Sequence, residues 1–164
     1  MRVAARKPDS AADSVGFMLS TLGHAVSRRF VHALQPLELH PREFAVLRAV
    51  QANDGQSQQT LAARLHIPPS RMVAIVDELE ARGLIERRPD PGDRRVRALF
   101  VTDRGQTLLA DAFALVRENE RAISDVLTAE ERGQLLELLT RISERLGLPT
   151  DVHSALRDGD TRGG

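Results

Sequence analysis

The feature that most constrains this chain is a pair of short helical segments, joined by a few residues and followed at once by two short strands. Ser57 is a predicted N-cap for the first helix. Pro69 suits the first turn of the second helix, which we expect to run to about Arg82 and to stop at Gly83. Because two short helices joined by a tight turn form the skeleton of a helix–turn–helix, the sequence predicts this motif.

The sequence period changes after Gly83 in a way that predicts a β-hairpin. Residues 84–88 and 96–101 favour short strands, and residues 89–95 between them are dense in Pro, Asp and Gly. Six Arg against three acidic residues give the segment 82–97 an excess of positive charge, although the formal net charge of the chain is zero. A partner of negative charge is therefore expected at the hairpin.

Long amphipathic segments flank this centre on both sides. Thr102 is a predicted helix cap, and Thr128 with Glu131 resembles a capping box. The flanking segments carry more apolar surface than so small a core can cover, so two chains are expected to pair through them. The predicted fold is mainly α with a small β-hairpin wing. Its parts are a flexible arm at 1–12, a dimerisation helix at 13–40, a winged helix–turn–helix core at 41–101, dimerisation helices at 102–148 and a flexible tail at 149–164.

Composition narrows the classes of function. The chain has no Cys, which excludes disulfides, thiol-based sensing and Cys-ligated zinc. Its five His show no i, i+4 pair, so we expect no metal site and no other cofactor. We find no Gly-rich phosphate loop and no hydrolase or metalloprotease motif, so no enzymatic activity is expected. No apolar run reaches the ~18 residues that span a bilayer, and the first residues do not resemble a signal peptide, so the expected location is the cytoplasm.

The second helix of the motif has two different faces. Apolar residues recur on one face at helical spacing and are expected to pack inward: Met72, Ile75, Val76 and Leu79. The first turns of the opposite face carry the candidate DNA-reading residues Ser70, Arg71, Val73 and Ala74. In a major groove, Arg71 suits a guanine edge, and Val73 or Ala74 suits a thymine methyl group. The alternative is an ordinary amphipathic surface helix.

The hairpin and the start of the motif supply further candidate DNA contacts. A narrow tip with adjacent Arg residues can reach into a minor groove, where the potential is most negative. The candidate wing residues are Arg87, Arg88, Asp93, Arg94, Arg95 and Arg97. We expect Ser57 and Gln58 to contact the DNA backbone. The alternative is a set of salt bridges within the hairpin, each of which contributes only about 0–1 kcal/mol.

Three stretches resemble the MarR family of bacterial winged helix–turn–helix transcriptional regulators. Residues 79–87 resemble the end of the family's recognition helix and its first wing strand, 90–95 resemble its wing signature, and 99–105 resemble its second strand and the start of the next helix. The resemblance covers about residues 14 to 146. It implies a homodimer on double-stranded DNA with a palindromic operator, with a recognition helix at 69–82 in the major groove and a wing at 89–96 in the minor groove.

The resemblance also implies roles for single wing residues. Arg95 matches the family's minor-groove Arg, Asp93 matches the acid that orients it, and Arg94 then favours the phosphate backbone. One departure concerns the recognition helix. Val73 and Ala74 are apolar where the family often has polar residues, so the base contacts at these two positions are expected to differ.

A small aromatic or anionic effector, bound between the dimerisation helices and the winged core, is a further implication of the resemblance. The candidate lining residues are Phe17, His24, Arg28 and Phe44, each of which can also be an ordinary core or surface residue. The resulting hypothesis is a homodimeric, sequence-specific repressor that an effector releases or modulates. Two alternatives stay open: a helical interaction or scaffold protein whose winged core does not bind DNA, and a DNA-binding protein without an effector.

Overall fold

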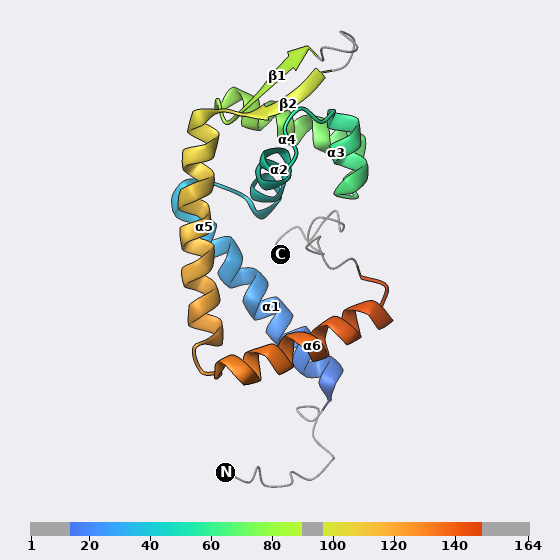
Figure 1. Cartoon of the computed structure of the whole chain (residues 1–164), viewed down its shortest axis with the longest axis vertical. Helices are drawn as coiled ribbons and strands as arrows, with labels where there is room; N and C mark the ends of the chain where they lie inside the picture. The colour runs from blue at the N-terminus through green and yellow to red at the C-terminus, as the bar shows by residue number, and fades with distance from the viewer. Residues whose placement is uncertain (1–13, 90–96, 149–164) are drawn as a thin grey trace, which may run out of the picture.

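The structure, a computed structural model, describes residues 14–89 and 97–148. Its elements are α1 (Val15–Leu34), the 3-10 helix η2 (Gln35–Leu37), α2 (Pro41–Gln51), α3 (Gln58–Arg64), α4 (Pro69–Ala81), β1 (Ile85–Pro89), β2 (Arg97–Val101), α5 (Asp103–Ser124) and α6 (Ala129–Arg145). Figure 1 shows α2, α3, α4 and the hairpin at one end of the molecule and α6 at the other, with α1 and α5 running between them. The predicted fold class, mainly α with a small hairpin, is confirmed.

Side-chain caps explain where several helices begin. Ser14, Ser57, Thr102 and Thr128 each accept a hydrogen bond from the backbone N–H three residues later, so the caps predicted at the last three positions are confirmed. The predicted capping box is also present, because the Thr128 N–H donates to Glu131 Oε2 at 2.8 Å. This backbone bond and a second bond from the Thr128 hydroxyl lower the pKa of Glu131.

Two long helices end in short turns. α1 ends at Leu34, and Pro36 lies inside the following 3-10 helix η2, where its missing N–H is not needed. α5 starts at Asp103 and ends at Ser124. The residues after it form a turn in which the Leu127 N–H donates to the Ser124 carbonyl at 3.1 Å.

A third segment, which the sequence does not indicate, pairs with the two-stranded hairpin. β1 and β2 are antiparallel and pair from Ile85 with Val101 to Pro89 with Arg97. On the other edge of β2, the segment before α3 adds two hydrogen bonds, one from Gly55 N–H to the Leu99 carbonyl and one from Leu99 N–H to the Gln56 carbonyl, both at 3.0 Å. Gly55 has a φ of 81°, a left-handed conformation that favours glycine at this turn. The hairpin is thereby fixed to the start of the helix–turn–helix.

One apolar core lies inside the winged end. Its fully buried side chains come from every element around it, among them Leu34, Leu47, Leu61, Met72, Leu79, Ile85, Leu99 and Leu109. The four residues predicted to form the inner face of α4 are all buried. Because α1 and α5 each contribute residues to this core only near one end, the rest of their length extends away from it.

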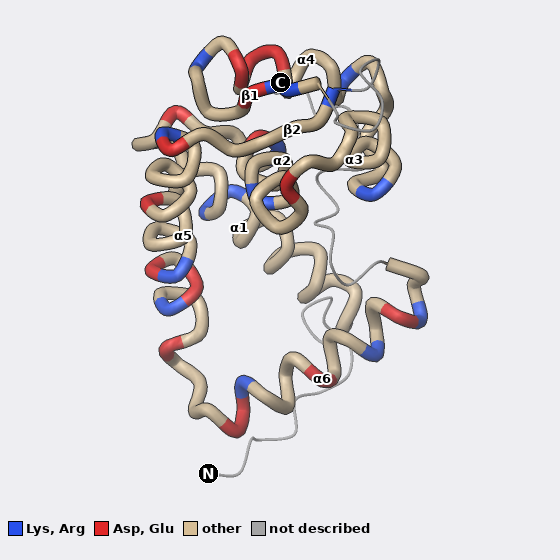
Figure 2. The backbone as a smooth tube through the Cα atoms, turned by 45° about the horizontal axis from the view of Figure 1, so that its top comes forward, with Lys and Arg blue, Asp and Glu red and all other residues tan. Residues whose placement is uncertain are grey.

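The other end of the chain leaves a large apolar surface uncovered. No residue of α6 is buried, and the side chains of Leu136 and Leu146 are 62% and 66% exposed. Residues 15–27 of α1 contain no charged residue, and this stretch of α1 is free of coloured segments in Figure 2. Together they form the α1–α6 groove, a hollow of about 740 Å³ whose walls include Met18, Leu22 and Leu138. None of the described helices combines the length and the hydropathy needed to cross a lipid bilayer.

α5 begins in close contact with the turn between α4 and β1. The Thr102 hydroxyl donates to the Gly83 carbonyl at 2.6 Å, and the Thr102 N–H donates to the Leu84 carbonyl at 3.1 Å. One helical turn later, a Cβ on Gly105 would lie 2.1 Å from the Leu84 carbonyl oxygen and 2.7 Å from a methyl carbon of Val101. Glycine at this position is therefore what allows α5 to start so close to the hairpin.

We expect Gly105→Ala to destabilise the protein by about 1–3 kcal/mol, because the added methyl group overlaps a backbone carbonyl that cannot move alone. Gly133→Ala is the matched control. Gly133 lies in α6 with nothing within 4 Å of its Cβ position. The control should stabilise the protein by about 0.5–1 kcal/mol through helix propensity. Thermal unfolding of the two variants measures both effects, and a melting temperature for Gly105→Ala at or above that of the parent would contradict the packing argument.

Candidate nucleic-acid interface

The turn between α3 and α4 places α4 across the end of α3. His66 adopts a left-handed conformation with a φ of 52°, and the Ile67 N–H returns to the Ala62 carbonyl at 3.0 Å. Pro68 precedes α4 and makes no side-chain cap, so the fixed φ of Pro69 starts the helix. The chain reverses within these few residues, as a helix–turn–helix requires.

The predicted DNA-reading residues lie on the outward side of α4. Ser70, Val73 and Ala74 are exposed and Arg71 is half-buried. Val73 is a large apolar residue with 43% of its surface exposed, and no described element covers it. The first turns of α4 therefore present a small, mixed surface with one cation, of the kind that fits a major groove.

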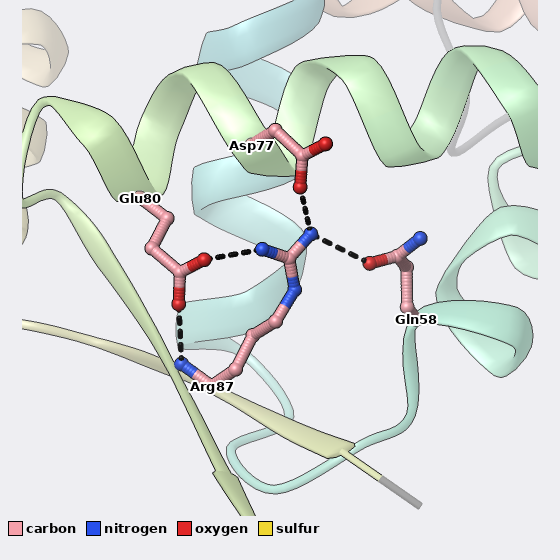
Figure 3. A network of polar contacts seen from close by, with 4 residues as sticks. All are labelled: Gln58, Asp77, Glu80 and Arg87. Carbon is pink, nitrogen blue, oxygen red and sulfur yellow. Dashed lines mark hydrogen bonds and ion pairs between the residues drawn. The ribbon is translucent and has the colours of Figure 1, made fainter.

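Arg87 lies at the centre of a polar network behind this surface (Figure 3). Its guanidinium forms ion pairs with Asp77 and Glu80 of α4, and its Nη2 also donates to Gln58 Oε1 at 3.1 Å. The backbone N–H of Arg87 donates to Glu80 Oε1 at 3.2 Å. Burial alone would lower the pKa of Arg87, but the hydrogen bonds and charges of Asp77 and Glu80 raise it. The network ties β1 to both helices of the motif.

Arg88 points to the other face of the hairpin, since successive side chains of a strand alternate. Its guanidinium carbon lies 4.6 Å from the centroid of the Phe100 ring, and it forms an ion pair with Glu86. Its side chain is 57% exposed, so water and other partners can still reach it. Arg88 is thus held at the edge of the hairpin rather than beside α4.

The remaining Arg residues near the hairpin divide into two groups. Arg82 is turned toward α2, where it pairs with Glu43 at 3.2 Å and donates to the Leu37 carbonyl at 3.4 Å. Arg71 and Arg97, by contrast, have no hydrogen bond or ion pair to any residue that the structure describes. Asp93, Arg94 and Arg95 lie outside the described residues, so their predicted roles at the wing stay predictions.

The two predicted backbone contacts already have partners within the chain. Ser57 Oγ accepts a hydrogen bond from the Thr60 N–H at 3.1 Å, and Gln58 shares the Arg87 network. Both line a hollow of about 510 Å³ between α3 and α4, together with Val73, Arg87 and Arg97. The structure therefore brings five predicted site residues from three parts of the sequence to one place.

The four predicted effector residues do not lie together in one chain. Phe44 is buried and makes edge-to-face contacts with Phe30 of α1 and Phe113 of α5, with ring centroids 5.9 and 5.4 Å apart. Phe17, His24 and Arg28 are exposed and share one side of α1. Phe30, which contacts Phe44, projects from a different side. Within a single chain, Phe44 is therefore separated from the other three.

The reasoning from sequence missed the role of the acids on α4. Asp77 and Glu80 are three residues apart, so they share a side of the helix, and both follow the candidate DNA-reading residues in the second half of α4. Two acidic residues on a helix that is expected to approach DNA indicate that a cation within the protein pairs with them. This was the feature of the sequence that could have predicted the role of Arg87. No three His, Asp or Glu side chains are placed to hold a metal ion in residues 14–89 and 97–148.

Comparisons with known proteins agree with this geometry. Residues 37–96 match the profile of the MarR family. A putative transcriptional regulatory protein for the hcr operon of Thauera aromatica is 34% identical over 134 residues, which are 81% of this chain and 81% of that protein. The chain belongs to the MarR family.

Solved MarR-family structures share the fold at similar identity. The transcriptional repressor CouR, bound to a 23-mer DNA duplex, is 34% identical and matches with a TM-score of 0.73. The match covers 85% of this chain and 99% of the CouR chain. CouR from Rhodococcus jostii RHA1, bound to p-coumaroyl-CoA, is also 34% identical and matches with a TM-score of 0.67. The match covers 82% of this chain and 95% of the CouR chain. The likeness extends beyond the winged core to the flanking helices.

We expect Arg71→Ala to relax discrimination at one base position in each half-site, with a loss of about 1–3 kcal/mol on the preferred sequence. Arg121→Ala removes the same charge from the far end of α5 and is the control. Binding to the preferred duplex and to single-base variants is measured by titration. Equal losses on preferred and random duplexes would instead make Arg71 a phosphate contact.

Proposed function

We propose that this protein is a homodimeric, sequence-specific DNA-binding repressor whose affinity for an operator is modulated by a small-molecule effector. It would act in the cytoplasm and by binding rather than by catalysis. The observation that carries the proposal is the outward face of α4, where Arg71 is unpaired among the described residues and small or apolar side chains surround it. A relative with 34% identity, CouR, is a transcriptional repressor with a structure on a DNA duplex.

The DNA-binding surface has two parts in this proposal. The first turns of α4 would enter the major groove, with Arg71 on a guanine edge and Val73 or Ala74 against thymine methyl groups. The hairpin would follow the adjacent minor groove, where Arg94 and Arg95 at its tip and Arg97 at its base would meet the strongest negative potential. Arg88, at the edge of the hairpin, is placed for a phosphate.

The α1–α6 groove supports the dimer. A monomer rarely exposes an apolar surface of this kind, and a second copy of the same chain offers an identical surface to cover it. Two-fold pairing would also present two copies of α4 to half-sites centred about 34–36 Å apart, one turn of B-DNA. A palindromic operator is the expected consequence.

The effector is proposed to be aromatic, anionic or both. CouR from Rhodococcus jostii RHA1 has been solved with p-coumaroyl-CoA, a ligand that combines an aromatic acyl group with a polyanionic carrier. In this chain, α1 contacts α5 through Arg29, whose Nε donates to Asn119 Oδ1 at 3.2 Å, and contacts the core through Phe30. A ligand that shifts α1 against α5 would therefore change the spacing of the two recognition helices. His24 and Arg28 on the exposed side of α1 are the candidate contacts for anionic groups.

Selection of bound duplexes from a random pool tests the proposal, followed by titration of the selected duplex over a range of salt. We expect a palindrome, and an affinity that falls steeply with salt because each phosphate contact releases counterions. The scaffold alternative predicts no enrichment and no retention on duplex DNA even in dilute buffer. That result would overturn the proposal.

We expect Leu138→Asp to convert the dimer to single chains and to weaken operator binding by at least about tenfold, since a carboxylate would be buried at the paired surface without a partner. Glu137→Ala, one residue away and on an exposed side of α6, is the matched control and should leave the dimer intact. Sedimentation velocity reports the mass of both variants. A parent protein that sediments as one chain would contradict the dimer, and a Leu138→Asp variant that remains paired would place the dimer interface elsewhere.

A further inference from the structure

We propose that Arg87 is a positioning residue for the DNA-binding surface and not itself a DNA contact. In this view it offsets part of the negative charge of Asp77 and Glu80 and holds β1 against the recognition helix α4. We name the four residues Arg87, Asp77, Glu80 and Gln58 the Arg87 clamp. The inference rests on the proposed function, and it departs from the sequence-based expectation that Arg87 binds DNA with the other Arg residues of the wing.

The geometry leaves the guanidinium of Arg87 little freedom. Its Nη1 is used by Glu80, and its Nη2 is shared between Asp77 and Gln58, so both terminal nitrogens have partners inside the protein (Figure 3). The backbone N–H of Arg87 adds a further bond to Glu80. The side chain is only 19% exposed. Three of its five N–H groups are therefore used inside the protein, and a phosphate could be reached only through Nε or the second Nη1 hydrogen of this largely covered side chain.

The charges explain why such a residue is needed. The side chains of Asp77 and Glu80 are 57% and 40% exposed, so these two carboxylates lie at the surface of a helix that is to approach a polyanion. Arg87 offsets them from within the protein. Arg71 and Arg97, without partners among the described residues, are then left for DNA, together with the exposed Arg88. The Arg residues near α4 thus divide into Arg82 and Arg87, which are internal, and Arg71 and Arg97, which are available.

The clamp also fixes the orientation of β1 relative to α4. It joins the third residue of β1 to the second half of α4 and to the first residue of α3. The clamp therefore sets the orientation of the hairpin strands β1 and β2 relative to the recognition helix. Loss of the clamp would let the two parts of the DNA-binding surface move relative to each other. Operator binding needs both at once, whereas loose binding to random DNA does not.

The test uses the full-length dimer, the selected operator duplex and a random duplex of the same length. The variants are Asp77→Asn, Glu80→Gln, Arg87→Met and Arg87→Lys, and the matched control is Glu78→Gln. Glu78 is an exposed acid on the same stretch of α4 with no ion pair among the described residues. The parent and all five variants are titrated over a range of salt. The fraction of each protein that can bind DNA is measured by stoichiometric titration, so that a loss of folded protein is not mistaken for a loss of affinity.

We expect each clamp variant to weaken operator binding by about tenfold, the usual size of a coupling between neighbouring side chains, and to leave random-duplex binding nearly unchanged. The acid variants are decisive, because they remove negative charge and yet should bind the operator less well. Glu78→Gln should bind as well as the parent or better. The salt dependence of Arg87→Met should match that of the parent, and Arg87→Lys should recover only part of the loss, since one ammonium group cannot reach all three partners.

A phosphate contact by Arg87 predicts the opposite pattern and would overturn the inference. Arg87→Met would then lower the salt slope by about 0.9 and weaken both duplexes equally. Asp77→Asn and Glu80→Gln would bind both duplexes more tightly, and Arg87→Lys would bind almost as well as the parent. If Arg87→Met does not fold, the two acid variants still decide between the patterns. A parent protein that selects no duplex overturns the proposed function as well, whereas a parent that binds while the acid variants bind equally or better overturns this inference alone.

Discussion

The orientation of the DNA-binding end depends on the close contact between the first turn of α5 and the turn that joins α4 to β1. Thr102 bonds to both Gly83 and Leu84, and Gly105 lets the helix backbone approach the Leu84 carbonyl without a side chain between them. A long helix therefore leaves the DNA-binding end with its direction fixed at the first turn. Because α5 leads on to α6, the orientation of α4 is tied mechanically to the surfaces where two chains are proposed to meet.

Polar contacts in the winged end serve two different purposes. Arg82 and Arg87 are used inside the protein, where they join α4 to α2 and to the hairpin. Arg71 and Arg97 have no partners among the described residues and are proposed, with Arg88 and the predicted wing residues Arg94 and Arg95, to bind an external partner. A chain with a formal net charge of zero can still offer a locally cationic surface, because unpaired Arg residues gather there while nearby acids are held in ion pairs. Net charge alone would have given no reason to expect DNA.

Local signals could be predicted from the sequence, and contacts between distant elements could not. Ser57, Thr102 and Thr128 act within their own helix turns, so their roles as caps followed from spacing. The pairing of Gly55 with β2 depends on where the chain returns in space. The role of Arg87 depended on the same long-range geometry, because nothing in the residues beside it indicates that Asp77 and Glu80 lie within reach. The family resemblance supplied the fold but not this division among the Arg residues.

α1 belongs to two environments at once, and this links folding to protein concentration. Its last turns are packed in the core through Leu34 and Phe30, while its first turns are uncharged and, in one chain, largely exposed. A helix with so little of its own surface covered is marginal in water, so its first turns gain much of their stability from association. The concentration of the protein would then set how ordered the first turns of α1 are as well as how many chains are paired. If the concentration of this regulator in the cell falls, the fraction of chains that are paired would fall as well.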